Sequence, residues 1–482
     1  MSKNKQAYIL ALTSSAFALL IFASTPRLYP LIQPDSTSYL DFSPTRSALY
    51  PFFLKCLQDL GLSLEQITWV QLSIFLGSLS ALVIGMLSMG LSRLVVVFFC
   101  ASETLNIYFL QFQATILSES LALSCQNLLA LSLMRYIFRP RLPGAALIGV
   151  FVGLAVATRP ALSAQIPLLA IILTACNWGQ SQRLLRHIPM AVAAISLVMA
   201  TESWLFFSVH DARQSLLPTL LMGKGAILSI DPDFSVTVGN PTVRKLALET
   251  KSAMAPASAS LEKINNPFLR ARFLAEWEVH AQYVLLQDRI KSLTEDTGWK
   301  ASDLLSSFGW SAIRQNPRGF VKLALVYYLG LWSVKETDFF AGLGHGDESR
   351  LMPVQIDANP GLGINRTILA LLLFPSFLAL GAAVLALTAY GAYKVLCSIP
   401  QWRRFQISQP LFTSFALALF VQGNLLLVAI FNVPTPRYLM STYPFAVLAV
   451  LIYADGLIKN YQKSRPNNAE AQKHPTLHTQ EP

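Results

Sequence analysis

The chain has 482 residues, of which 53% are hydrophobic and only 13% are charged. A soluble globular domain carries roughly a quarter charged residues, so this composition excludes an ordinary soluble protein and indicates a polytopic membrane protein. The net charge of +11 does not indicate nucleic-acid binding, because the basic residues are scattered between apolar runs and form no patch interleaved with aromatic residues. The five cysteines show no close pairing and predict neither a disulfide framework nor a metal site.

Ten apolar runs are long enough to cross a bilayer, which takes about 20 residues per helix. They lie near 7–24, 67–88, 94–110, 118–135, 143–159, 161–177, 188–208, 366–393, 409–432 and 439–458. The first run is predicted to be an uncleaved helix and not a signal peptide, because many further spans follow it. The runs on either side of the sequence ATRPA are short, and they predict either a hairpin or one broken helix.

The distribution of lysine and arginine predicts the topology, because these residues near the ends of spans resist translocation. Loops on the amino-terminal side of the spans carry fifteen of them, whereas the short loops opposite carry five: Arg27, Arg46, Lys55, Arg159 and Arg437. This difference predicts that both termini lie in the cytoplasm and that the loops with few basic residues are extracytoplasmic.

Four segments follow from these runs. We predict an N-terminal transmembrane module at 1–208 with a first outer loop at 25–65, an extracytoplasmic region with amphipathic helices at 209–365, C-terminal transmembrane helices at 366–458, and a disordered cytoplasmic tail at 459–482. The apolar stretch at 319–334 is short for a span, so it either lies in the membrane interface or dips into the bilayer.

The first outer loop contains a predicted amphipathic helix. Apolar residues recur there at intervals of three and four, at Leu49, Phe52, Phe53, Cys56, Leu57 and Leu60, and Gly61 ends the pattern. This helix is expected to lie on the outer membrane surface, and it follows a polar stretch that contains Asp35 and Asp41.

Charged residues gather at the predicted outer face in loops far apart in the sequence. They are Asp35, Asp41, Arg46, Glu103, Glu119, Arg159 and Arg437. Taken singly, each is also explained as a turn residue, a helix cap or a side chain that reaches the interface. Taken together, carboxylates and guanidinium groups on one face favour an anionic phosphate ligand, which arginine binds with a planar fork of donors.

Two glycine-rich stretches, GKG at 223–225 and GLGHGDE at 342–348, lack the rest of a phosphate-binding loop, so they do not predict a nucleotide site. The histidines share no ligand spacing, and no metal-binding residues are predicted.

The order of the motifs resembles that of the bacterial integral-membrane glycosyltransferases of the GT-C superfamily, of the protein mannosyl and aminoarabinose transferase type. The motifs are an acidic first outer loop with TRSALYPFFL, then ILSESLAL, GLAVATRPA, IRQNPRGFVK and PRYLMSTYP, and they span most of residues 7–458. The resemblance implies a bundle of about ten or more transmembrane helices in the bacterial inner membrane. It also implies transfer of a sugar, with inversion, from a polyprenyl-phosphate-linked donor to a lipid, glycan or protein acceptor on the extracytoplasmic face.

The resemblance also implies roles for individual residues, in a site between the first outer loop and the 209–365 region. Asp35 corresponds to the general base on the acceptor hydroxyl. Arg159 and Arg437 correspond to the groups that hold the donor phosphate. The residues expected to line the substrate are Tyr39, Arg46 and Tyr438.

This chain departs from many relatives of that type, which have two adjacent acids in the first outer loop. Here Ser36 follows Asp35. The departure leaves open whether Asp41, Glu103 or Glu119 supplies a second acid, and whether a divalent metal, Mg²⁺ or Mn²⁺, takes part.

Other functions fit parts of the sequence. A transporter or a lipid or glycan flippase is the main alternative, although such proteins usually bind substrate at repeat interfaces near the midplane. We find no internal repeat, and Glu202 is the main ionisable residue inside a span. A membrane scaffold and an enzyme similar to O-antigen ligases are further alternatives.

Overall fold

The computed structural model describes residues 9, 13, 15, 32–104, 106–231, 234, 240–332, 366–398 and 407–464. Within these ranges every regular element is a helix, which confirms the predicted all-α fold class. The predicted span near 7–24 lies outside the described residues apart from three positions, as do the stretch 342–348 and the tail beyond 464. Residues 459–464 of the predicted tail continue the last helix, because Lys459 donates hydrogen bonds to Asp455 and to the carbonyl of Gly90.

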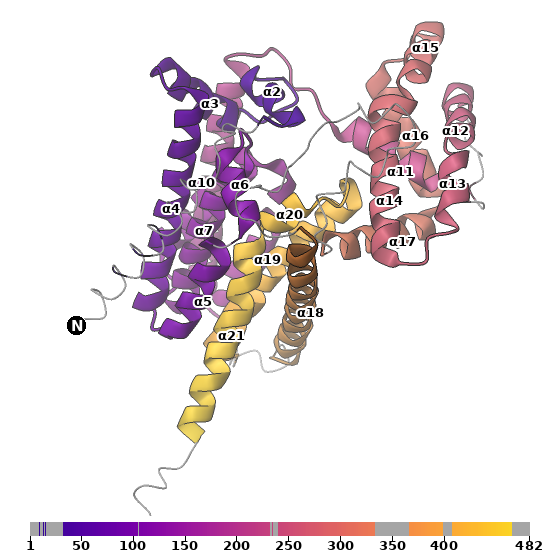
Figure 1. Cartoon of the computed structure of the whole chain (residues 1–482). Helices are drawn as coiled ribbons and strands as arrows, with labels where there is room; N and C mark the ends of the chain where they lie inside the picture. The colour runs from indigo at the N-terminus through magenta and orange to yellow at the C-terminus, as the bar shows by residue number, and fades with distance from the viewer. Residues whose placement is uncertain are drawn as a thin grey trace, which may run out of the picture.

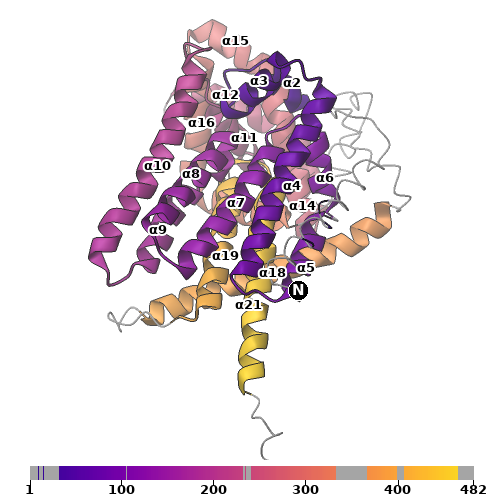
Figure 2. The ribbon, with the colours of Figure 1, turned by 90° about the vertical axis from the view of Figure 1, so that its left-hand side faces the viewer.

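The bundle consists of helices packed side by side (Figures 1 and 2). They are α4 (Leu64–Ser88), α5 (Arg93–Thr104), α6 (Ile107–Ala114), α7 (Glu119–Phe138), α8 (Leu142–Thr158), α9 (Gln165–Cys176), α10 (Ser181–Phe207), α18 (Arg366–Ser398), α19 (Gln409–Phe431) and α21 (Tyr443–Ser464). Five helices are long and apolar enough to cross a membrane by length and composition: α4, α7, α10, residues 376–398 of α18, and α19. The chain is therefore an integral membrane protein of the helical, polytopic class.

One predicted span is interrupted in the structure. The run near 94–110 is divided between α5 and α6. The runs around ATRPA form two separate helices, α8 and α9, which are joined through the short 3-10 helix η1 (Pro160–Leu162).

Residues 217–331 form a second group of helices beside one end of the bundle (Figure 1). They are α11 (Leu217–Leu228), α12 (Pro241–Ala253), α13 (Ala255–Leu261), α14 (Pro267–His280), the π-helix η2 (Ala281–Leu285), α15 (Gln287–Thr297), α16 (Ala301–Gln315) and α17 (Pro317–Leu331). We call α11–α17 the outer helices. The apolar stretch at 319–334 corresponds to α17, whose 15 residues span about 22 Å and are too short for a full crossing. It packs against α14 on one side and against α19 and α20 (Pro436–Met440) on the other.

The first outer loop contains α2 (Pro34–Leu40) and α3 (Leu49–Asp59). The predicted helix at α3 is present, and the side of it that packs into the protein is not the side that carries the apolar repeat. Tyr50 and Leu54 are buried, whereas Cys56 and Leu60 are exposed. The reason is that the Tyr50 hydroxyl donates a hydrogen bond of 2.6 Å to Gln71 of α4, which turns this side of α3 toward the bundle.

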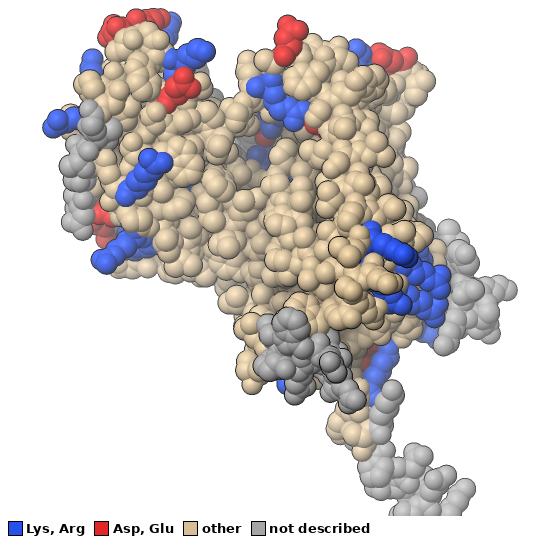
Figure 3. All heavy atoms as spheres, turned by 180° about the vertical axis from the view of Figure 1, so that it is seen from behind, with Lys and Arg blue, Asp and Glu red and all other residues tan. Residues whose placement is uncertain are grey.

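Basic side chains are unevenly distributed over the bundle. Figure 3 shows lysine and arginine gathered on its flank toward the end opposite α2 and α3, below a broad surface with few charges. This is the end that the sequence predicts to face the cytoplasm. The same view shows a notch between the bundle and the outer helices in which basic and acidic side chains are visible.

Candidate active site

Two acids and three arginines from separate parts of the chain meet at the α2 end of the bundle. They are Asp35 in α2, Arg46 in the loop that follows, Glu119 at the start of α7, Arg159 at the end of α8 and Arg437 in α20. We call these five residues the charge cluster. Each of them was singled out in the sequence, and the structure brings all five together.

The members of the charge cluster alternate in sign. Arg46 Nη2 lies 2.7 Å from Asp35 Oδ1, and Arg437 Nη1 lies 2.9 Å from Asp35 Oδ2. The same Arg437 nitrogen lies 3.7 Å from Glu119 Oε1, which also accepts Arg159 Nη1 at 2.6 Å. The side chains of Glu119 and Arg159 are only 3% and 7% exposed, whereas those of Asp35 and Arg437 are each 32% exposed. The Asp35 side of the cluster is therefore the side that is open to solvent.

The residues next to Asp35 in the sequence place its side chain at the start of α2. Pro34 occupies the first turn of α2, and the backbone N–H of Gln33 donates to Ser36 Oγ at 2.9 Å, which caps the helix. Asp35 thus lies in the first turn, where a carboxylate interacts favourably with the helix dipole. Arg46 is held over α2 by a hydrogen bond of 2.8 Å from its Nε to Ser38 Oγ.

The rest of the first outer loop is anchored on α10 and the segment after it. The backbone N–H of Ala48 donates to Glu202 Oε1 at 2.8 Å, and Arg213 donates to both oxygens of Glu202. His210 Nε2 lies 2.6 Å from the carbonyl oxygen of Phe42, which has a positive φ of 46°. Glu202 therefore holds the loop that contains Asp35. This buried acid is the main ionisable residue inside a predicted span.

Two predicted lining residues, Tyr39 and Tyr438, pack directly on the arginines. The Tyr438 ring centroid lies 4.7 Å from Arg159 Cζ and 5.6 Å from Arg437 Cζ, and the Tyr39 ring lies 4.6 Å from Arg46 Cζ. Cation–π contacts of this kind contribute about 0.5–2 kcal/mol each and hold a guanidinium group in one plane.

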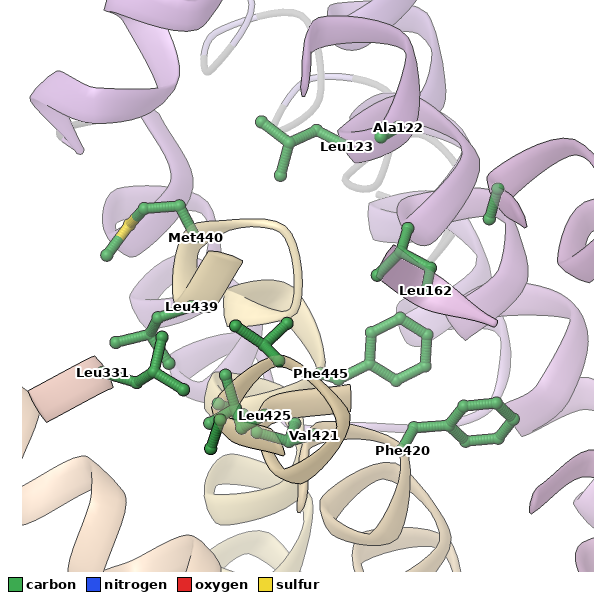
Figure 4. Close-up of a cluster of buried hydrophobic side chains, with 14 of the residues drawn as sticks. Ala122, Leu123, Leu162, Leu331, Phe420, Val421, Leu425, Leu439, Met440 and Phe445 are labelled. Atoms are coloured by element: carbon green, nitrogen blue, oxygen red, sulfur yellow. The ribbon is translucent and has the colours of Figure 1, made fainter. Parts of the chain in front are cut away.

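Packing beneath α20 fixes the side chains of Arg437 and Tyr438. Leu439 and Met440 enter the buried apolar core with Leu331 of α17 and Leu425 of α19 (Figure 4). Arg437 and Tyr438, which precede them in α20, are left partly exposed and contact the charge cluster.

The electrostatics of the charge cluster keep Asp35 ionised. Burial by itself would raise the pKa of Asp35, but the guanidinium groups of Arg437 and Arg46 outweigh it and hold the pKa of this carboxyl well below its usual range. Burial would likewise lower the pKa of Arg437, but the charge of Asp35 raises it well above the usual value. Asp35 is therefore a carboxylate at any physiological pH, and it is a weak base as long as both arginines remain on it.

One residue near Asp35 was missed in the sequence. The Tyr283 side chain is 54% exposed, and partial desolvation together with the negative charge of Asp35 raises the pKa of its phenol, so the field of Asp35 extends to the outer helices. Tyr283 lies on η2, and π-helical segments are frequent at functional sites. The sequence around it shows no pattern that predicts a π-helix.

The structure distinguishes the three candidates for a second acid, which are Asp41, Glu103 and Glu119. Glu119 belongs to the charge cluster. Asp41 is exposed at the end of α2, and Glu103 is fully buried on α5 with both carboxylate oxygens lacking a hydrogen-bond partner among the described residues. In the described part of the chain, neither Asp41 nor Glu103 forms an ion pair with the charge cluster.

The charge cluster does not fit a divalent metal. Asp35 and Glu119, its two carboxylates, are each paired with arginine, and a cation there would compete with three guanidinium groups. Among the described residues, no group of three or more histidine, cysteine, aspartate or glutamate side chains is placed to hold a metal ion.

Comparisons with known proteins give one distant likeness. No protein-family model and no curated protein matches the sequence. Among solved structures, the chain is similar to the crystal structure of ArnT from Cupriavidus metallidurans bound to undecaprenyl phosphate, with 12% sequence identity and a TM-score of 0.34, over 87% of this chain and 76% of that chain.

Proposed function

We propose that the protein is a membrane glycosyltransferase that moves a sugar from a polyprenyl-phosphate-linked donor to an acceptor hydroxyl on the extracytoplasmic face, with inversion. The charge cluster is the observation that supports this proposal. Its carboxylates and arginines come from four separate segments, and three of its members, Asp35, Arg46 and Arg437, are partly exposed. Partly exposed arginines suit a phosphate group, which the guanidinium binds with a planar fork of donors.

In the proposed reaction, the acceptor oxygen attacks the anomeric carbon as Asp35 takes its proton. The bond between the anomeric carbon and the phosphate oxygen breaks, and both of its electrons leave with the polyprenyl phosphate. Arg437, with Arg159 behind it, stabilises the negative charge that develops on that oxygen.

The pairing of Asp35 with Arg437 suggests how the donor prepares the base. A donor phosphate that binds Arg437 competes with the carboxylate for the same guanidinium group. Asp35 then loses one of its two charge partners, keeps Arg46 on Oδ1, and becomes more basic as Oδ2 is freed. Glu119 is too deeply buried to meet an acceptor, and in this mechanism it holds Arg159 in place.

Sugar transfer by membranes from cells that lack the native gene tests the proposal. Asp35→Asn should lose transfer and accumulate lipid-linked sugar, whereas Asp41→Asn, a matched change in the same loop, should stay close to wild type. Arg437→Ala should also lose transfer because the donor phosphate loses its partner. All variants must be compared at equal amounts of inserted protein.

Two outcomes would contradict the proposal. Activity of Asp35→Asn near the wild-type level would show that Asp35 is not the general base. Movement of a lipid-linked sugar across the bilayer without a new glycosidic bond would instead indicate a transporter or flippase, a function in which broken helices and midplane sites are usual.

A further inference from the structure

The lysine of the GKG sequence is buried inside the outer helices. Lys224 lies in the middle of α11, and its side chain is 2% exposed. A Cβ added to Gly223 would lie 2.1 Å from Gln282 Nε2, and one added to Gly225 would lie 2.9 Å from Phe308. The two glycines therefore allow the neighbouring helices to close around the lysine, which leaves no room for a phosphate.

Lys224 belongs to a buried polar network. Its Nζ donates to Glu278 Oε2 at 3.1 Å and lies 4.2 Å from the centroid of the Tyr327 ring. The Tyr327 hydroxyl donates to the same Glu278 oxygen at 2.6 Å, and Gln282 Nε2 donates to the other oxygen at 3.3 Å. A buried ion pair of this kind contributes little net stability, so it is weak evidence for a role in stabilising the fold.

A hydrogen bond from Lys224 connects this network to a residue outside the outer helices. Lys224 Nζ also donates to the carbonyl oxygen of Asn432 at 2.7 Å, and Asn432 is the C-cap of α19. A cation at this position complements the negative end of the helix dipole. The Asn432 side chain in turn accepts a hydrogen bond of 3.3 Å from the hydroxyl of Tyr438, whose ring lies on Arg159 and Arg437.

We propose that Lys224 is a positioning residue that fixes residues 432–438 on the outer helices and thereby sets Arg437 and Tyr438 against Asp35 and Arg159. Pro434 and Pro436 restrict the backbone between Asn432 and Arg437, so a displacement at Asn432 is passed along the segment. The role in catalysis rests on the proposed function. The fixing of residues 432–438 does not depend on it.

Hydrogen exchange on the full-length protein in nanodiscs tests the positioning directly. The double variant Lys224→Met/Glu278→Gln removes both buried charges, so neither is left unpaired. We expect amide exchange within 432–440 to become about tenfold faster or more, with thermal unfolding close to wild type. The matched control is Asp455→Asn/Lys459→Met, which removes a lysine–aspartate pair on α21 and should leave exchange at 432–440 unchanged.

Tyr438→Phe keeps the test decisive if the double variant does not fold. It removes only the hydroxyl that reaches Asn432 and retains the ring on the arginines, so exchange at 432–440 should again rise. Unchanged exchange in a folded double variant, or in Tyr438→Phe, would overturn the proposal.

Kinetics separate this inference from the proposed function. If the wild type transfers sugar, the double variant should raise KM for the polyprenyl-phosphate donor about tenfold and leave KM for the acceptor within about twofold, because the arginine contacts are disturbed. A donor KM equal to wild type would reject the catalytic role of Lys224. If the wild type transfers no sugar, the proposed function fails and the exchange result still decides whether Lys224 fixes the segment.

Discussion

Replacing Glu119 by glutamine tests whether the deep half of the charge cluster is a true buried ion pair. The carboxylate and the Arg159 guanidinium are 2.6 Å apart, and the side chains are 3% and 7% exposed, so water cannot replace a lost partner. Removing one partner of a buried pair costs about 3–5 kcal/mol. Arg437, with Nη1 3.7 Å from the same oxygen, loses an attraction as well. We expect Glu119→Gln to lower the free energy of unfolding by about 3–5 kcal/mol.

Equilibrium unfolding in mixed micelles, followed by circular dichroism, measures this change. The double variant Glu119→Gln/Arg159→Met should recover most of the loss, because it leaves no unpaired charge in the interior. Arg46→Met should cost at most about 1 kcal/mol, since the pair of Arg46 with Asp35 is partly exposed. A loss below about 1 kcal/mol for Glu119→Gln, or a double variant as costly as the two single changes added together, would refute the reasoning.

Two further predictions concern packing and pH. Gly149→Ala should destabilise the protein by about 1–3 kcal/mol, because the added Cβ would lie 2.4 Å from the carbonyl oxygen of Ala191 in α10. At Gly77 an added Cβ would have no neighbouring atom within 4 Å, so Gly77→Ala should be neutral or stabilising. Thermal unfolding of the two variants measures the difference between them. The pKa of Asp35 is lower in the folded chain than in the unfolded chain, so its pairing stabilises the fold fully above about pH 4 and is lost as the pH falls further. Asp35→Asn should therefore lose less stability than wild type on acidification below pH 4, and an equally steep acid loss would contradict this.

Much of the fold follows from local pattern. Apolar runs, the amphipathic repeat of α3 and the break at ATRPA are each set by residues close together in the sequence, so they are predictable without a structure. The loops that carry Asp35, Glu119, Arg159 and Arg437 were also predictable, because a charge at the end of an apolar run is conspicuous.

The face of each helix and the partners of each charge were not predictable in this way. The sequence favoured Phe52, Phe53 and Cys56 as the apolar face of α3, but the contact with α4 buries Tyr50 and Leu54. An apolar repeat next to a membrane does not show whether protein or lipid covers it. Only the packing of the bundle shows which side of a helix faces lipid and which side is covered by protein.

The sequence by itself determined that this is a helical membrane protein with acids and arginines at one end of its spans, because composition and periodicity are properties of short windows. Only the tertiary structure decided that Asp35 pairs with Arg437 across 402 residues, that Glu119 and not Glu103 joins the charge cluster, and that Lys224 is tied to Asn432. Such pairs depend on how helices from distant parts of the chain pack together, and no local pattern in the sequence encodes that packing.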